Sequence, residues 1–158
     1  MKNFVIGAAL ALSALVATPA MASDFAGPRV EVTAGADDVT RGVDPTDVTY
    51  GIGAGYDLQF GKVVAGVEAG VDNVLDRRDI GVGARLGYVL NENVLLFTKV
   101  GYSNFKPTNR LTLEGVRVGG GLEVNVAGPV YAKVEYRYTD FEGATGKHGG
   151  LVGVGYRF

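Results

Sequence analysis

The last ten residues of the chain alternate between two kinds of side chain. In the run from Gly149 to Phe158, Val152, Val154 and Tyr156 occupy every second position, and glycine, leucine or arginine fills the positions between. A period of two places alternate side chains on opposite faces of a β-strand. One face is therefore apolar. If that face meets the hydrocarbon of a bilayer, both strand edges need hydrogen-bonding neighbours, and the run indicates a closed β-barrel.

The N-terminus has the features of a secretory signal. Lys2 precedes an apolar stretch over residues 4–16, and Ala20-Met21-Ala22 is a small-x-small cleavage site. The apolar stretch is shorter than the roughly 20 residues of a transmembrane helix, which disfavours the alternative of an uncleaved membrane anchor. We expect a signal peptide over residues 1–22 and a barrel domain over residues 23–158.

Eight segments of the remaining chain show the same alternation. They are expected at residues 28–37, 48–59, 61–72, 78–90, 93–104, 110–126, 130–141 and 148–158. Tight connections at 59–61, 91–93 and 127–129 alternate with longer polar ones at 38–47, 73–78, 105–109 and 142–147. Short turns at one end and longer loops at the other are typical of an even-stranded barrel with both termini in the periplasm. The sequence predicts an all-β, eight-stranded, antiparallel, up-and-down transmembrane β-barrel.

The composition of the two faces indicates which one meets lipid. Alternation alone is also compatible with a soluble barrel that has an apolar interior. However, the face opposite the apolar one combines charged residues with many glycines, which would weaken solvent-facing strands for no gain. Inside a narrow eight-stranded barrel, glycine leaves space for long charged side chains. Lys62 is assigned to this inner face, and the predicted lumen charge network comprises Glu68, Arg85, Lys99, Arg117, Glu123, Lys133, Glu135 and Arg137.

Aromatic residues on the apolar face gather near the strand ends. Tyrosine favours the headgroup level of a membrane, with its ring toward the acyl chains and its hydroxyl toward water. Two aromatic girdles are therefore expected. The periplasmic girdle comprises Tyr56, Tyr88, Tyr156 and Phe158, and the extracellular girdle comprises Tyr50, Tyr102 and Tyr138.

The last hairpin resembles that of a known family. The segment Val130–Phe141, followed by a short loop and Gly153-Val154-Gly155-Tyr156-Arg157-Phe158, is similar to the C-terminal hairpin of the opacity-type outer-membrane β-barrels. These are small, porin-like surface antigens of Gram-negative bacteria. The resemblance implies an outer-membrane location and brings no catalytic motif and no cofactor. The expected partners are outer-membrane lipid, lipopolysaccharide and the barrel-assembly machinery, which would engage the C-terminal strand ending in Phe158.

Few residues could support catalysis or nucleic-acid binding. The chain has no cysteine, and its net charge of −2 provides no basic surface for a phosphate backbone. A lipid-deacylating pair of Ser103 and His148, oriented by Glu142, is conceivable at the outer rim. The predicted strands that carry the serine and the histidine are not neighbours, although nucleophile and base must come within hydrogen-bond reach. We therefore expect no enzymatic activity.

Charged residues in the predicted loops suggest two weaker hypotheses. A calcium site is conceivable, but the spacing matches no regular calcium loop and nearby arginines cancel much of the charge, so solvated turns are expected. The acidic residues concerned are Asp37, Asp38, Asp44, Asp47, Asp72, Asp76 and Asp79. Cationic residues could approach lipopolysaccharide phosphates. They are Arg77, Arg78, Lys106, Arg110 and Lys147.

The predicted lumen charges allow two functions. Buried charges are tolerated when they are paired and hydrogen-bonded, so a mutually neutralised plug would leave the protein a structural and surface component of the envelope. Alternatively, the glycines could leave a continuous water path, and the charged wall would then select ions in a narrow channel. The sequence predicts the plug and leaves the channel as the alternative.

Overall fold

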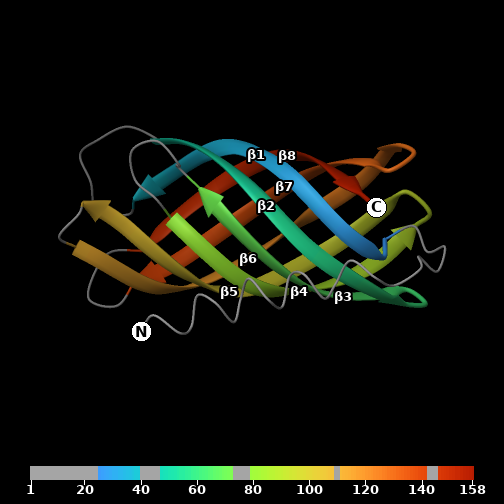
Figure 1. Cartoon of the computed structure of the whole chain (residues 1–158), viewed down its shortest axis with the longest axis horizontal. Helices are drawn as coiled ribbons and strands as arrows, with labels where there is room; N and C mark the ends of the chain where they lie inside the picture. Colours follow the sequence, from blue (N-terminus) through green and yellow to red (C-terminus); the bar gives the residue numbers. More distant parts are fainter. Residues whose placement is uncertain (1–24, 40–46, 73–78, 109–110, 142–145) are drawn as a thin grey trace.

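The computed structural model describes residues 25–39, 47–72, 79–108, 111–141 and 146–158. Over these residues, eight strands form one antiparallel sheet that closes on itself in sequence order (Figure 1). The strands are β1 (Gly27–Val39), β2 (Asp47–Phe60), β3 (Val63–Asp72), β4 (Asp79–Asn91), β5 (Val94–Thr108), β6 (Leu111–Ala127), β7 (Val130–Phe141) and β8 (Lys147–Arg157). The predicted eight-stranded antiparallel barrel is confirmed.

Pairing between β1 and β8 closes the barrel. The paired residues run from Arg29 opposite Arg157 to Val39 opposite Lys147. Beyond β8, the N–H of Phe158 donates to the C=O of Pro28 at 2.9 Å. Every strand therefore has a neighbour on both edges, which satisfies the backbone groups of a sheet surrounded by lipid.

The three tight turns lie at one end of the barrel, together with the C-terminus (Figure 1). We call this the turn end and the opposite one the loop end. Gly61 and Gly128 lie in two of these turns with φ of 62° and 52°, a left-handed conformation that favours glycine. In the third turn, the side-chain oxygen of Asn91 accepts a hydrogen bond from the N–H of Asn93 at 2.9 Å. Short connections thus fix the register of three hairpins.

The two faces of the wall differ as the alternation predicts. On β1, the outward Val32 is 59% exposed, whereas the inward Arg29 is 1% exposed. The other strands repeat this contrast between exposed apolar side chains and charged side chains that are buried or half-buried. Lys62 was assigned wrongly to the inner face: it lies in the turn between β2 and β3 and is exposed, because the turn interrupts the period of two.

At the loop end, four of the strands, β1, β2, β5 and β8, extend further than the sequence predicts. A connection was expected at 105–109, but β5 continues to Thr108 and β6 begins at Leu111. Cross-strand pairing overrides the local loop signal, and Pro107 falls where the register between the two strands shifts. The predicted signal peptide, residues 1–22, lies outside the described residues. Among the described residues, no helix is long and apolar enough to cross a membrane.

Candidate functional site

The lumen is filled by ion pairs. In the described part of the chain, eight cationic side chains pair there with eight carboxylates, so the lumen charges balance. The cations are Arg29, Arg85, Lys99, Arg117, Lys133, Arg137, Lys147 and Arg157, and the carboxylates are Glu31, Asp37, Asp57, Glu68, Asp72, Asp79, Glu123 and Glu135. These pairs fall into three groups along the barrel axis.

The group nearest the turn end is a closed ring of four residues, one from each even-numbered strand. This lower ring consists of Asp57, Arg85, Glu123 and Arg157. Arg85 lies 3.3 Å from Asp57 and 3.0 Å from Glu123, and Arg157 lies 3.4 Å and 2.6 Å from the same two carboxylates. Each member therefore has two partners across the lumen, although their strands are not adjacent in the sheet.

The second group is a closed ring of six residues from the odd-numbered strands. In order around this middle ring, the members are Arg29, Glu68, Lys99, Glu135, Lys133 and Glu31. Cations and carboxylates alternate, and the contacts of Lys99 with Glu68 and Glu135 are both 2.8 Å. The two rings are joined, because Arg29 also donates to Asp57 at 3.0 Å.

The third group, near the loop end, is a row of six residues. In order, this rim row runs through Lys147, Asp37, Arg137, Asp72, Arg117 and Asp79. Arg137 lies 3.0 Å from Asp37 and 2.6 Å from Asp72. At one end of the row, the hydroxyl of Ser103 donates to Asp79 and accepts from Arg117.

Inward glycines provide the space for these side chains. A Cβ atom at Gly55 would lie 2.9 Å from the guanidinium carbon of Arg29, and one at Gly66 would collide with the carboxylate of Asp57. Alanine at either position would displace a member of a ring. The abundance of glycine on the charged face therefore has a steric cause.

An apolar floor closes the turn end below the rings. Phe25, Val64 and Leu95 are completely buried and pack together. The backbone N–H of Phe25 donates to the side-chain oxygen of Gln59 at 3.1 Å, and the guanidinium of Arg157 lies 5.5 Å from the Phe25 ring centre. Sequence reasoning missed this floor, although the apolar residues at inward positions were a usable signal.

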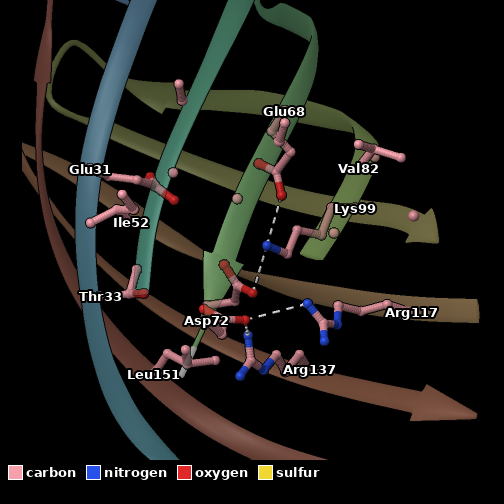
Figure 2. Close-up of a pocket in the computed structure, with 18 of the residues that line it drawn as sticks. Glu31, Thr33, Ile52, Glu68, Asp72, Val82, Lys99, Arg117, Arg137 and Leu151 are labelled. Atoms are coloured by element: carbon pink, nitrogen blue, oxygen red, sulfur yellow. Dashed lines mark hydrogen bonds and ion pairs between the residues drawn. The ribbon is translucent and has the colours of Figure 1, made fainter. Parts of the chain in front are cut away.

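A cavity of about 70 Å³ separates the middle ring from the rim row. Its charged lining comes from both groups, as Figure 2 shows for Glu68 and Lys99 on one side and Asp72 and Arg117 on the other. Inward glycines of β2 to β5 form part of its wall. They are Gly53, Gly70, Gly81, Gly83 and Gly101. We call this cavity the chamber.

All eight side chains of the predicted lumen charge network take part in these ion pairs. The sequence did not identify their partners correctly at the loop end. Asp37, Asp72 and Asp79 were expected in solvated turns and Lys147 near lipid phosphates, but all four belong to the rim row. Asp37, Asp72 and Asp79 already lie within the predicted strands, at inward positions, and only Lys147 is added by the extension of β8 beyond its predicted start.

Tyrosines occupy both faces of the wall. The predicted girdle residues lie outward: Tyr50, Tyr56, Tyr88, Tyr102, Tyr138, Tyr156 and Phe158. Tyr131 is the exception, since it lies completely buried in the lumen and its hydroxyl donates to Glu31 at 2.9 Å. The inward parity of Tyr131, which it shares with Lys133, was the signal that sequence reasoning overlooked.

The structure contradicts the hypothesis that Ser103 and His148 form a catalytic pair. Ser103 points into the lumen, where it is bonded to the rim row, whereas His148 has outward parity on β8 and its ring lies 6.3 Å from the exposed Tyr136. The barrel wall separates the two side chains. Glu142, the proposed orienting residue, lies outside the described residues.

Several loop residues lie beyond what the structure describes. Within the described ranges, no group of three or more histidine or acidic side chains could hold a metal ion. The other acidic and cationic loop candidates fall on undescribed segments or undescribed side chains. They are Asp38, Asp44, Asp47, Asp76, Arg77, Arg78, Lys106 and Arg110.

Comparison with known proteins agrees with this architecture. Residues 8–158 match the family described as outer membrane protein beta-barrel domain. The chain is 30% identical over 133 residues to the 25 kDa outer-membrane immunogenic protein of Brucella ovis, which covers 73% of this chain and 66% of that protein. It is 32% identical over 116 residues to the 22 kDa outer membrane protein of Rhizobium leguminosarum bv. viciae, with 60% and 54% coverage. The matches thus span less than two thirds of these relatives, and neither name states an enzymatic activity.

Solved structures share the fold at low sequence identity. Neisserial surface protein A aligns with a TM-score of 0.56 and 15% identity, over 83% of this chain and 96% of that one. The outer membrane enzyme PagL aligns with a TM-score of 0.58 and 15% identity, over 82% and 99%. Because one neighbour is an enzyme, the fold alone does not determine activity. The family match does determine class and location: the chain belongs to the outer membrane protein β-barrel domain family and is an outer-membrane β-barrel of Gram-negative bacteria.

Proposed function

We propose that the protein is a structural and surface component of the envelope, with its lumen closed by paired charges. The observation that carries the proposal is the pair of closed rings, which span the lumen from every strand. An ion crossing the barrel would have to separate pairs in both rings. Leaving one charge of a buried pair without its partner costs about 3–5 kcal/mol.

Because of the arrangement of the rings, closure of the lumen does not depend on any single ion pair. Every member of a ring has two partners of opposite charge, so loss of one contact leaves the other in place. Below them, the apolar floor of Phe25, Val64 and Leu95 offers no polar group to a passing ion. These features support a rigid, closed barrel rather than the alternative of a narrow channel.

Planar-bilayer recording of the refolded protein tests the proposal. We expect no steady conductance from the unaltered chain. Combined replacement of Asp57, Glu123, Glu68 and Glu135 by alanine, which removes two carboxylates from each ring, is expected to produce openings. Asp140→Ala, at an exposed outward position, is the matched control and should leave the protein closed. Steady openings of the unaltered protein, with an ion preference that changes on replacing Arg117, would establish the channel instead.

We further propose that the protein has no enzymatic activity and that its partners are lipids and the assembly machinery. The separation of Ser103 from His148 by the barrel wall supports the first point. The apolar outer face supports contact with outer-membrane lipid and lipopolysaccharide, and the exposed C-terminal Phe158 is available to the barrel-assembly machinery. Lipid A acylation should be the same in cells with and without the protein. A difference that disappears in Ser103→Ala would contradict the proposal.

A further inference from the structure

The structure contains a cavity that the proposed closure does not use. We propose that the chamber between the middle ring and the rim row binds water and small uncharged polar molecules, which enter from the loop end. This inference rests on the closed lumen proposed above. The inference names the class of ligand that would occupy a space that the side chains of the barrel leave unfilled.

The chamber has room for guests because part of its wall is glycine, which has no side chain to fill the space. One water needs roughly 10–15 Å³ of comparable volume, so a chamber of about 70 Å³ accommodates several waters or one small molecule. The glycine wall is fixed by close packing, since a Cβ at Gly83 would lie 2.8 Å from the C=O of Val100. A side chain at Gly83, or at Gly101, where a Cβ would lie 2.5 Å from the C=O of Val82, would therefore require the strands to move.

The chamber also offers hydrogen bonds. An ammonium group has three donors, and the middle ring supplies Lys99 with two carboxylate partners, Glu68 and Glu135. Lys133 likewise has two ring partners. Within the described residues, each lysine therefore has one donor beyond those that the ring uses. Glu68 and Lys99, with side chains 17% and 13% exposed, are the ring members most accessible to solvent.

The charges around the chamber favour uncharged guests. Within the described ranges, its lining has as many carboxylates as cations, and each is already paired. The carboxylates are Glu31, Glu68, Asp72 and Glu135, and the cations are Lys99, Arg117, Lys133 and Arg137. A free ion would have to displace a counter-charge that is covalently attached to the wall, whereas an uncharged polar molecule needs only hydrogen bonds.

The two ends of the chamber are not equivalent. Toward the turn end lie the middle ring, the lower ring with side chains at most 7% exposed, and the apolar floor. Toward the loop end, the described residues provide only the rim row, in which Asp72 and Arg117 are 14% and 11% exposed. Among the described residues, entry past the rim row therefore crosses one layer of ion pairs, whereas entry from the turn end crosses two layers and the floor.

Cysteine labelling tests the site, because the chain has no cysteine of its own. Thr33 lines the chamber, so we would refold Thr33→Cys into lipid vesicles and react it with methyl methanethiosulfonate and with its ammonium-bearing and sulfonate-bearing analogues. The uncharged reagent is expected to react at least ten times faster than either charged one. Leu95→Cys, buried in the floor below both rings, is the matched control and should react with none of them.

Two outcomes would overturn the inference. They are a T33C thiol that is inert to all three reagents, and one that reacts equally with all three. If the unaltered protein shows no steady conductance, the closed lumen survives either result and only the chamber assignment fails. Steady conductance of the unaltered protein refutes the closed lumen itself. Should T33C fail to fold, transfer of magnetisation from water to the Gly101 amide, measured by NMR on the unaltered protein in nanodiscs, decides the matter: we expect transfer, and its absence rejects the site.

Discussion

Adjacent residues of one strand experience opposite surroundings in this barrel. On β7, Lys133 is 4% exposed and contacts Glu31 and Glu135 in the lumen, whereas the next residue, Val134, is 52% exposed. Outward side chains meet only lipid and their neighbours along the wall. Inward side chains meet residues far away in the sequence, as Lys133 meets Glu31 at a separation of 102 residues. The inner face therefore carries the specific contacts, and the outer face mainly requires apolar character.

We expect the largest difference in stability between the two faces when a carboxylate is neutralised. Asp57→Asn removes the charge that faces Arg29, Arg85 and Arg157, and leaves three buried cations with fewer partners. We expect the free energy of unfolding to fall by about 3–5 kcal/mol. Asp140→Asn, at an exposed outward position, should change it by less than about 0.5 kcal/mol. Urea unfolding in lipid vesicles measures both, and equal effects would contradict the distinction between the faces.

Glycines on the two faces should also respond differently. A Cβ at the inward Gly155 would collide with the buried ring of Tyr131, and Gly155→Ala should destabilise the barrel by about 1–3 kcal/mol. At the outward Gly150, nothing lies within 4 Å of such an atom. Gly150→Ala should therefore be neutral or slightly stabilising. The same unfolding measurement, repeated in a Tyr131→Leu background, should show that the cost at Gly155 decreases; a cost that persists would rule out the collision as its cause.

Two tyrosines allow a finer comparison. Tyr131→Phe removes a buried hydroxyl that donates to the Glu31 carboxylate at 2.9 Å, and should reduce stability by about 1.5 kcal/mol. Tyr136→Phe, on the exposed outer face, should change stability by less than about 0.5 kcal/mol. Thermal unfolding of the two variants side by side is sufficient. A larger loss for Tyr136 than for Tyr131 would show that the outer face carries specific contacts.

The smallest effect is expected for the aromatic pair at the end of β8. The rings of Tyr156 and Phe158 meet edge to face with centroids 4.8 Å apart, an interaction worth about 0.5–1.5 kcal/mol beyond burial. Phe158→Leu keeps the apolar character and should cost no more than that amount in urea unfolding. A substantially larger loss of unfolding free energy would mean that this outward residue makes contacts as specific as those of a ring member.

Much of the architecture was accessible from the sequence. The period of two, with valine and tyrosine on one parity and arginine, glutamate and glycine on the other, predicts the strands, their faces and the position of residues such as Arg85 and Lys99 in the lumen. The strand ends next to the loops were predicted less well. Asp37, Asp72 and Asp79 fall within the predicted strands but resemble loop residues in their local sequence, and the arginines that pair with them in the lumen come from other strands.

The sequence by itself therefore determined that this chain forms a lipid-facing barrel with a charged interior, because side-chain alternation is a local property of each strand. Only the tertiary structure decided which charge meets which. Asp57 faces arginines from β1, β4 and β8, and Glu135 faces lysines from β5 and β7. Those pairings depend on the closure and register of all eight strands, which bring residues to the same level of the lumen whatever their separation in the chain.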